Sequence, residues 1–390
     1  MTAKDILGNP DYLAISFGGY RDTTRNNQPT LAQLKEDLKI LYAMGIRIVR
    51  TYNVQLPHAP NVVKAISELK KELPGFEMYV MLGAWIDCKH AWTELTPDHH
   101  QESEQNEGEI NRAIALAKEY PSIIKVIAVG NEAMVKWAES YYVQPGVILK
   151  WVLQLQKLKA KNELPKDLWI TSSDDFSSWG GGDPMYHVPE LEQLIQAVDF
   201  VSMHTYPMHN THYNPFFWGV TTEEKKLPKE KILSLSMKRA VSFATDQYEQ
   251  VKAYVQRIAS GKPVHIGETG WATTSDGFYG PNGAKACDEY KEKLYYESMR
   301  NWSNENGISC FYFEAFDEPW KDAGNPIGSE NHFGLITVDG KAKYALWEKV
   351  DQGIFDGLTR DGRPITKSLD GNEKLVLEKA MIPPLNHHLK

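Results

Sequence analysis

Cysteine is scarce in this sequence of 390 residues. Only Cys88, Cys287 and Cys310 are present, and no two of them form a CxxC pair. An odd number of widely spaced cysteines predicts neither a disulfide framework nor a zinc knuckle, although one disulfide could form. The fold must therefore depend on a hydrophobic core, for which a hydrophobic content of 42% is sufficient.

Long apolar runs and an excess of positive charge are also absent. No run approaches the ~20 residues of a transmembrane helix, and the start, MTAKDILGNPDYLAIS, lacks the charged and apolar regions of a secretory signal. The formal net charge is −8. Because a mildly acidic surface does not attract nucleic acid or anionic membranes, we expect neither as a partner. A neutral or cationic small ligand, or an uncharged polymer, fits better.

Short runs rich in β-branched or aromatic residues alternate with longer segments of helical periodicity. Near-continuous apolar strands that alternate with helices are typical of a parallel sheet, and eight such units predict a closed α/β barrel, the (β/α)8 TIM barrel. A doubly wound open sheet is the alternative. The strands are expected at 12–18, 46–52, 76–83, 124–130, 168–173, 199–206, 263–270 and 308–316.

The domain organisation is simple. No repeat, low-complexity tract or Pro/Gly/Ser linker divides the chain, which predicts one catalytic domain over residues 1–390. A C-terminal tail, from about 365 to 390, either packs on the barrel or hangs free. Segments 86–106 and 207–234 are longer than a minimal barrel needs, and they predict extended loops that form a cleft.

Two glutamates close apolar strands, Glu132 in VGNEA and Glu268 in HIGETGW. Strands four and seven lie across a barrel from each other, so these carboxylates are expected to face one cavity at the C-terminal ends of the strands. Paired carboxylates across a groove are the apparatus of glycoside hydrolysis. A single strand-end glutamate could equally cap the next helix or pair with an arginine, but two on these strands favour catalysis.

The motifs VGNEA, IGETGW and FYFEAFDEPWK, followed by HFGLITVDGKAKY, resemble those of the family 17 glycoside hydrolases. These are the β-1,3-glucanases of the retaining (β/α)8 clan, and VRTYN and VMLGAW are weaker echoes of the family. The resemblance implies hydrolysis of β-1,3-glucan such as laminarin without a cofactor. One departure is Ala272, which stands where the family usually has the proline of ETGWP and puts fine specificity in doubt.

The resemblance also implies roles for individual residues. Glu132 corresponds to the general acid/base and Glu268 to the nucleophile, while Asn131 corresponds to the amide that bonds the sugar 2-hydroxyl. Tyr206 corresponds to the tyrosine that touches the nucleophile. The other polar groups expected to bind substrate or support the catalytic pair are Tyr52, Glu314, Glu318 and Lys321.

The chemistry of retention agrees with these roles. It requires carboxyl groups roughly 5 to 5.5 Å apart, one ionised and one protonated. The negative charge of Glu268 should raise the pKa of Glu132, which keeps Glu132 protonated near neutral pH. Once the glycosyl-enzyme has formed, that charge is gone and Glu132 can ionise to act as a base.

Five tryptophans follow the predicted strands. Flat indole rings stack on the apolar faces of pyranose units, although a single tryptophan is more often part of the core. Five near one face predict sugar platforms, and we expect these first at Trp179, Trp271 and Trp320. The remaining two are Trp85 and Trp218.

Several histidines invite a metal interpretation. His204, His209 and His212 fall close together, but their spacing matches no firm zinc pattern and the chemistry above needs no metal. We therefore expect His204 to line the sugar site, with no metal there, although a structural Ca²⁺ in the acidic loops stays open. The pairs His99–His100 and His387–His388 are expected to be solvent-exposed.

Two alternatives in function remain open. A β-1,3-glucanosyltransferase uses the same two glutamates but lets a sugar hydroxyl replace water. A catalytically silent carbohydrate-binding barrel would have lost one of the carboxylates, and both are present. A polysaccharide substrate favours export to the periplasm, cell surface or medium, with a cytoplasmic location as the alternative. We expect a monomer, although no sequence feature bears on the oligomeric state.

Overall fold

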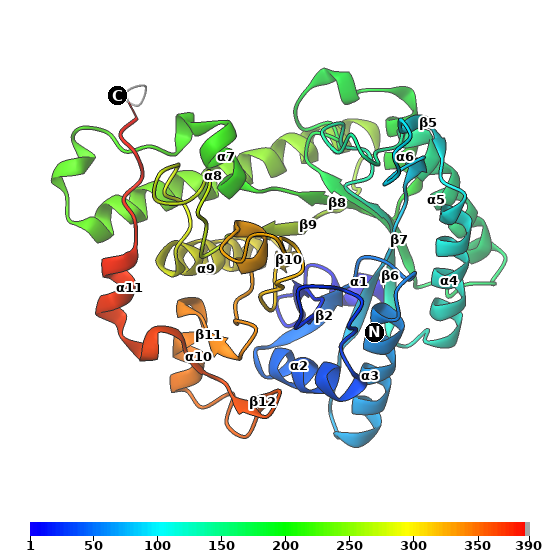
Figure 1. Cartoon of the computed structure of the whole chain (residues 1–390). Coiled ribbons are helices and arrows are strands. Elements are labelled where there is room, and N and C mark those ends of the chain that lie inside the picture. Colours follow the sequence, from blue (N-terminus) through cyan, green and yellow to red (C-terminus); the bar gives the residue numbers. More distant parts are fainter. Residues whose placement is uncertain (387–390) are drawn as a thin grey trace.

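The computed structural model describes residues 1–386, and its centre is a closed barrel of eight parallel strands (Figure 1). The strands follow one another around the barrel in the order β1, β10, β9, β8, β7, β6, β3, β2. This arrangement confirms the predicted (β/α)8 barrel and rules out the open sheet. The bounds are β1 Leu13–Ser16, β2 Ile46–Arg50, β3 Tyr79–Ala84, β6 Ile124–Asn131, β7 Trp169–Asp175, β8 Val201–His204, β9 Val264–Gly270 and β10 Cys310–Phe313.

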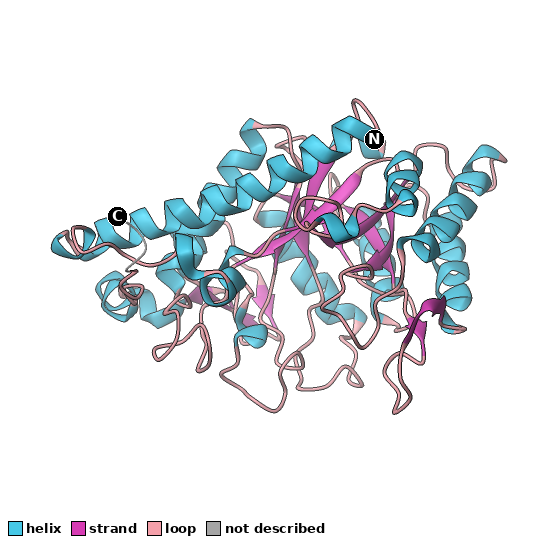
Figure 2. Cartoon of the chain, turned by 90° about the horizontal axis from the view of Figure 1, so that it is seen from above, coloured by secondary structure: helices cyan, strands magenta, loops and turns pink. Residues whose placement is uncertain are grey.

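Helices form the outer layer, and the loops at the strand ends gather on one side (Figure 2). Sequence signals set the helix ends. At the start of α2, for example, the Thr30 hydroxyl accepts from the Gln33 N–H, and the Gln33 side chain accepts from the Thr30 N–H. The long outer helices are α2 Leu31–Ala43, α3 His58–Glu72, α4 Gln105–Glu119, α5 Pro145–Ala160, α6 Pro189–Ala197, α8 Lys229–Ile258 and α9 Glu289–Glu305.

The barrel interior is apolar at one end and polar at the other. At the N-terminal end, the short helix α1 (Ala3–Ile6) packs under the barrel, where Ile6 lies in one buried cluster with Met81 and Phe311. Toward the C-terminal end the interior holds the buried polar side chains of Arg50 and His204. Since buried polar groups need partners, this end of the barrel holds a hydrogen-bonded network rather than a core.

The long segment after β3 contains a feature that was not predicted. Two short strands, β4 (Cys88–Lys89) and β5 (Asp98–Glu102), pair antiparallel as a hairpin. Its loop projects on the side where the strand ends gather (Figure 2). The sequence DHHQE of β5 is polar throughout and has no alternating pattern, so nothing in it indicated a strand.

The C-terminal segment packs on the barrel as far as residue 386. It contains β11 (Lys341–Ala342), α10 (Trp347–Asp351), β12 (Thr359–Arg360), β13 (Arg363–Pro364), β14 (Thr366–Lys367) and α11 (Glu373–Lys379). Leu385 bridges to Val220, at the end of the segment that follows α7 (Pro207–Tyr213). His387 and His388 lie outside the described residues. All three cysteines are buried free thiols. Within residues 1–386, no helix has both the length and the apolar character needed to cross a bilayer.

Candidate active site

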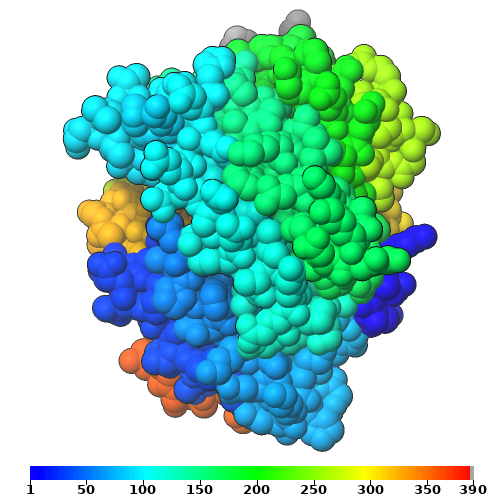
Figure 3. Space-filling view, turned by 90° about the vertical axis from the view of Figure 1, so that its right-hand side faces the viewer, coloured from blue at the N-terminus to red at the C-terminus, as the bar shows by residue number. Residues whose placement is uncertain are grey.

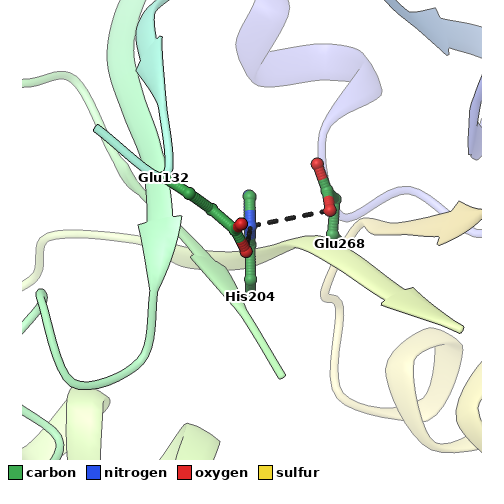
Figure 4. A group of neighbouring side chains, drawn as sticks. All are labelled: Glu132, His204 and Glu268. Atoms are coloured by element: carbon green, nitrogen blue, oxygen red, sulfur yellow. Dashed lines mark hydrogen bonds and ion pairs between the residues drawn. The ribbon is translucent and has the colours of Figure 1, made fainter. Parts of the chain in front are cut away.

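Glu132 and Glu268 stand on opposite sides of His204 at the C-terminal ends of β6 and β9 (Figure 4). His204 Nδ1 lies 3.0 Å from Glu132 Oε1 and 3.6 Å from Glu268 Oε2. An oxygen of each carboxylate and a ring nitrogen of His204 all lie within 4.8 Å of one another. That spacing suits a double displacement, in which the two carboxyl groups are about 5 to 5.5 Å apart.

Glycines near the ends of β6 and β9 allow the carboxyl groups of the two glutamates to come this close. Gly130 has φ +81°, and a Cβ there would meet the Ala133 Cβ at 2.8 Å. A Cβ on Gly267 would lie 2.1 Å from the Ser202 Oγ. Glu132 itself has φ +47°, a left-handed conformation that is unfavourable for a side chain with a Cβ, and its N–H donates to the Ser173 carbonyl at 2.9 Å. Such strain is concentrated at functional sites.

Glu268 is held in the ionised form. The Arg50 guanidinium donates to its Oε1 at 2.8 Å, and the Tyr206 hydroxyl donates to its Oε2 at 2.7 Å. Burial alone would raise the pKa of Glu268, but the Arg50 cation and the Tyr206 hydrogen bond bring it below its ordinary value. At neutral pH this carboxylate is therefore charged.

Glu132 is shifted in the opposite direction. Burial raises its pKa well above the ordinary value, and the nearby charges of Glu268 and Asp175 raise it further. Glu132 consequently carries a proton near neutral pH. Two carboxyl groups with opposed protonation states can supply one nucleophile and one proton donor.

Arg50, the last residue of β2, links the components of the site, and it was not among the predicted site residues. Its guanidinium donates to the Asn131 Oδ1 at 2.6 Å and to the Gly267 carbonyl at 2.7 Å, in addition to Glu268. Its side chain is almost completely buried. The signal available in the sequence was a charged residue near the end of the predicted strand IRIVRTY.

His204 is neutral and does not belong to a histidine cluster. Burial lowers its pKa to about 4, and its Nε2 lies 2.7 Å from the Ser173 Oγ. His209 stacks near Phe333, and His212 stacks on Phe278 with ring centroids 4.0 Å apart, so the three rings do not converge.

One group of side chains in residues 1–386 could bring metal ligands together, namely Glu132, His204 and Glu268. The Arg50 cation, 2.8 Å from a Glu268 oxygen, opposes a second cation there. The arrangement therefore fits a proton-transfer site better than a metal site.

The predicted residues after β10 form a buried charge cluster. Lys321 Nζ lies 2.7 Å from Glu314 Oε1 and 3.5 Å from Glu318 Oε2, and Glu318 also accepts from the Tyr20 N–H at 3.1 Å. Burial raises the pKa of Glu314 well above its usual range. These two carboxyl groups are thus occupied by protein partners.

Tyr52 packs near Phe313, the residue before Glu314, with ring centroids 6.4 Å apart. Its hydroxyl donates to the Ser16 Oγ at 2.9 Å, and the Arg50 guanidinium lies 4.7 Å from its ring centroid.

The predicted sugar platforms at Trp179 and Trp271 are wrong. Both rings have no exposed surface, and their indole N–H groups donate to the carbonyls of Ser202 and Ala286. Trp218 is buried in the same way, with its N–H on the Ala284 carbonyl. These rings fill space around the barrel, because large apolar side chains gain most free energy there. No face of them is available to a sugar.

Trp320 and Trp85 differ from these three because both are partly exposed. The Arg25 guanidinium lies 4.3 Å from the Trp320 ring centroid, and the Trp320 N–H donates to Glu318 Oε2 at 3.2 Å. Trp85 donates to Asp87 Oδ1 at 2.6 Å. Trp320 therefore remains a predicted platform.

A family model described as the BtgE/BtgC glycoside hydrolase domain matches residues 14–334. The chain belongs to this glycoside hydrolase family. A curated relative, "Probable glucan endo-1,3-beta-glucosidase btgC" of Aspergillus flavus, is 26% identical over 362 residues, which cover 88% of this chain and 45% of that protein. "Glucan 1,3-beta-glucosidase" of Arthroderma benhamiae is 40% identical over 119 residues, covering 27% of this chain and 36% of that protein. The chain thus spans less than half the length of these relatives.

Solved structures extend the family comparison. The crystal structure of an endo-laminarinase from Formosa Hel1_33_131 has 61% identity and a TM-score of 0.99, covering 100% of this chain and 99% of that one. An active-site mutant of Rhizomucor miehei beta-1,3-glucanosyltransferase in complex with laminaritriose has 21% identity and a TM-score of 0.59, covering 86% and 96%. At that identity the second structure shows a likeness of fold alone.

Proposed function

We propose that this glycoside hydrolase is an endo-acting, retaining enzyme of family 17 that cleaves β-1,3-glucan such as laminarin. The observation that carries the mechanism is the placement of Glu132 and Glu268 on either side of His204, with carboxylate oxygens 3.0 and 3.6 Å from its Nδ1, and the opposite directions of their pKa shifts agree with it. The choice of substrate is supported by the 61% identity to the endo-laminarinase over the whole chain.

In the first step, the ionised Glu268 attacks the anomeric carbon while the bond from that carbon to the glycosidic oxygen breaks. The proton of Glu132 passes to the departing oxygen, so that the leaving sugar is neutral. Arg50 and Tyr206 hold the Glu268 carboxylate in place for this attack. The products are a glycosyl ester on Glu268 and an ionised Glu132.

In the second step, Glu132 acts as the base. The negative charge on Glu268 has been consumed in the ester, which removes one cause of the raised pKa of Glu132. Glu132 takes a proton from water, the water oxygen bonds to the anomeric carbon, and Glu268 leaves as a carboxylate. Two displacements restore the original anomeric configuration.

Asn131 is oriented to bind the sugar. Its Oδ1 accepts from Arg50 at 2.6 Å, which leaves the amide N–H groups to donate. In our proposal they bond the 2-hydroxyl of the sugar attached to Glu268, a contact that strengthens as charge develops on the ring.

The test compares wild type with Glu268→Ala on laminarin and on defined β-1,3-gluco-oligosaccharides. We expect short β-1,3 oligomers from the wild type and none from the variant, while the exposed Glu107→Gln on α4 behaves as wild type. Azide should partly restore turnover of an activated β-glycoside by Glu268→Ala and give a glycosyl azide of inverted configuration. Activity retained in Glu268→Ala would disprove the mechanism.

The same experiment separates hydrolysis from transfer. Products longer than the donor that predominate even at low substrate concentration would identify a glucanosyltransferase that uses the same glutamates. Binding of the glucan without release of reducing ends would identify a silent carbohydrate-binding barrel. Because a polymeric glucan is encountered outside the cell, the proposal includes an exported or cell-surface location, which fractionation of the source cells tests.

A further inference from the structure

Trp92 lies in the hairpin of β4 and β5, and 62% of its surface is exposed. It also has a left-handed backbone, with φ +61°. Both features are unfavourable, because apolar area left in water forgoes the free energy of burial and the Cβ of a left-handed residue is crowded by the backbone. Folding alone gives no reason for this combination.

The Trp92 ring is nevertheless held in one orientation. It stacks on Tyr141, with ring centroids 4.9 Å apart and planes at 22°. Its indole N–H donates to Asp87 Oδ1 at 3.2 Å, and the same oxygen accepts from the Trp85 indole at 2.6 Å. One face of Trp92 is covered by Tyr141, and the high exposure of the residue places the other face in solvent.

The hairpin is fastened to the loop that follows Glu132. The Cys88 N–H donates to the Tyr141 carbonyl at 3.0 Å, and the Gln144 N–H donates to the His99 carbonyl at 3.2 Å. The His99 ring stacks on Tyr142 at 3.6 Å. These contacts set the position of Trp92 relative to the segment that begins at Glu132.

This position is on the Glu132 side of the site. Tyr141 packs in one buried cluster with Val135, which follows Glu132 by only three residues, so this ring lies on the Glu132 side. Around the barrel, β10 is opposite β6, so Trp320 after β10 lies across the site. In Figure 3 the residues around 85–105 (cyan) project at the upper left, and the loop after β10 (golden yellow) lies below them on the same edge of the molecule.

The direction of proton transfer assigns this side to the leaving group. Glu132 gives its proton to the glycosidic oxygen, so the departing sugar must lie beyond that oxygen, on the side of Glu132. We infer that Trp92, supported by Tyr141 and Asp87, is the platform of a binding subsite for a glucose unit of the departing part of the β-1,3-glucan. The apolar face of the pyranose stacks on the exposed indole face. This inference rests on the proposed function.

Trp92 also takes part in the second step, in which the glycosyl ester on Glu268 is cleaved. A β-1,3-gluco-oligosaccharide that accepts the glycosyl group from Glu268 enters from the same side that the leaving sugar has vacated. Trp92 therefore also holds an acceptor sugar, whose hydroxyl then competes with water for the ester. At high oligosaccharide concentration the wild type should form transfer products through this platform.

The experiment measures kcat/KM on two substrates with Trp92→Ala. Laminarihexaose fills the departing side with sugar, whereas β-laminaribiosyl fluoride has a fluoride ion as leaving group and places nothing there. We expect kcat/KM on the hexaose to fall about tenfold, in line with the loss of one stacked contact, and the ratio of hexaose to fluoride activity to fall by a similar factor. Cleavage of reducing-end-labelled hexaose should shift toward shorter departing fragments, and transfer products should decrease.

Three further measurements make the result decisive. Trp92→Tyr, which keeps a flat ring, should recover most of the ratio, and Leu95→Ala, an exposed change in the same hairpin, should leave it unchanged. A melting temperature near that of the wild type excludes unfolding of the hairpin. An unchanged ratio in Trp92→Ala would overturn the subsite while leaving the proposed function intact. A wild type that cleaves neither substrate would instead overturn the proposed function.

Discussion

At the scale of single residues, the site is a set of charges whose neighbours fix their protonation. Glu132 and Glu268 have the same chemistry in water, yet burial and the charge of Glu268 raise the pKa of Glu132, while the Arg50 cation and the Tyr206 hydrogen bond lower that of Glu268. The neutral His204 adds no charge of its own to the site at neutral pH. The surroundings of the two glutamates therefore make one a proton donor and the other a nucleophile.

The first prediction concerns pH. Activity on laminarihexaose should follow a bell whose acid limb lies below 4.5, where Glu268 becomes protonated, and whose alkaline limb marks the loss of the Glu132 proton. Glu132→Ala should lower kcat/KM on this substrate about a thousandfold. On β-laminaribiosyl fluoride, which needs no acid, the same variant should lose the alkaline limb. An alkaline limb that persists would assign it to another group.

The second prediction concerns Arg50. Replacing it with methionine removes the cation that stabilises ionised Glu268, so the pKa of Glu268 should rise and the acid limb should move to higher pH. We expect kcat to fall about a hundredfold, since a preorganised charge at the reacting group is lost. Arg50→Lys keeps the positive charge but cannot make all three hydrogen bonds to Glu268, Asn131 and Gly267, so its activity should be intermediate. An acid limb that does not move would contradict the assignment.

At the scale of elements, the backbone at the end of β6 also determines the position of the catalytic side chains. The left-handed backbone at Gly130 turns the chain at the end of β6 so that Glu132 leaves the strand, and a hydrogen bond from the Glu132 N–H to the Ser173 carbonyl on β7 stabilises this strained conformation. The β4–β5 hairpin uses the same loop as its support. A change in the backbone near Gly130 should therefore affect stability and catalysis together.

The third prediction tests that turn. Gly130→Ala places a Cβ 2.8 Å from the Ala133 Cβ, in addition to the left-handed backbone at φ +81°. Gly261→Ala is the matched control, with φ +79° and nothing within 4 Å of the added Cβ. We expect the control to lower the free energy of unfolding by about 1 kcal/mol and Gly130→Ala by clearly more. Denaturant unfolding gives both values, and equal losses would mean that the turn relaxes freely.

At the scale of the whole molecule, the chain beyond the last barrel strand is part of the fold. β12 lies beside α2 (Figure 1), and Arg360 on β12 donates to Asp37 on α2 at 3.1 Å with neither side chain exposed. Arg21 pairs with the same carboxylate at 2.7 Å. The C-terminal segment thus holds the N-terminal units through a buried charge cluster.

The fourth prediction tests this cluster. Asp37→Asn leaves Arg360 without its buried anion and should lower the free energy of unfolding by about 3 kcal/mol or more. Asp361→Asn makes the same chemical change at a partly exposed partner of Arg21 and should cost less than about 1 kcal/mol. Urea unfolding followed by circular dichroism measures both. Similar losses in the two variants would show that burial does not govern the strength of these pairs.

Much of the architecture was accessible from the sequence because the strands are continuous apolar runs. The run IKVIAVG indicated β6, and HIGETG indicated β9, each with its glutamate at the end. Boundaries were less accurate where bulky residues continue past the strand, as in the expected 308–316 against the observed β10. The polar hairpin β4–β5 was missed altogether, since its pairing depends on contacts with Tyr141 and Tyr142.

The sequence by itself determined the alternation of strands and helices and the placement of Glu132 and Glu268 at strand ends, because these depend on local periodicity and on the rule that parallel strands end together. Only the tertiary structure decided which tryptophans are exposed, since Trp271 and Trp92 differ in their surroundings and not in any local pattern. It also decided the role of Arg50. The Arg50 guanidinium can orient the site only because folding brings Asn131 and Glu268 within hydrogen-bond distance of it.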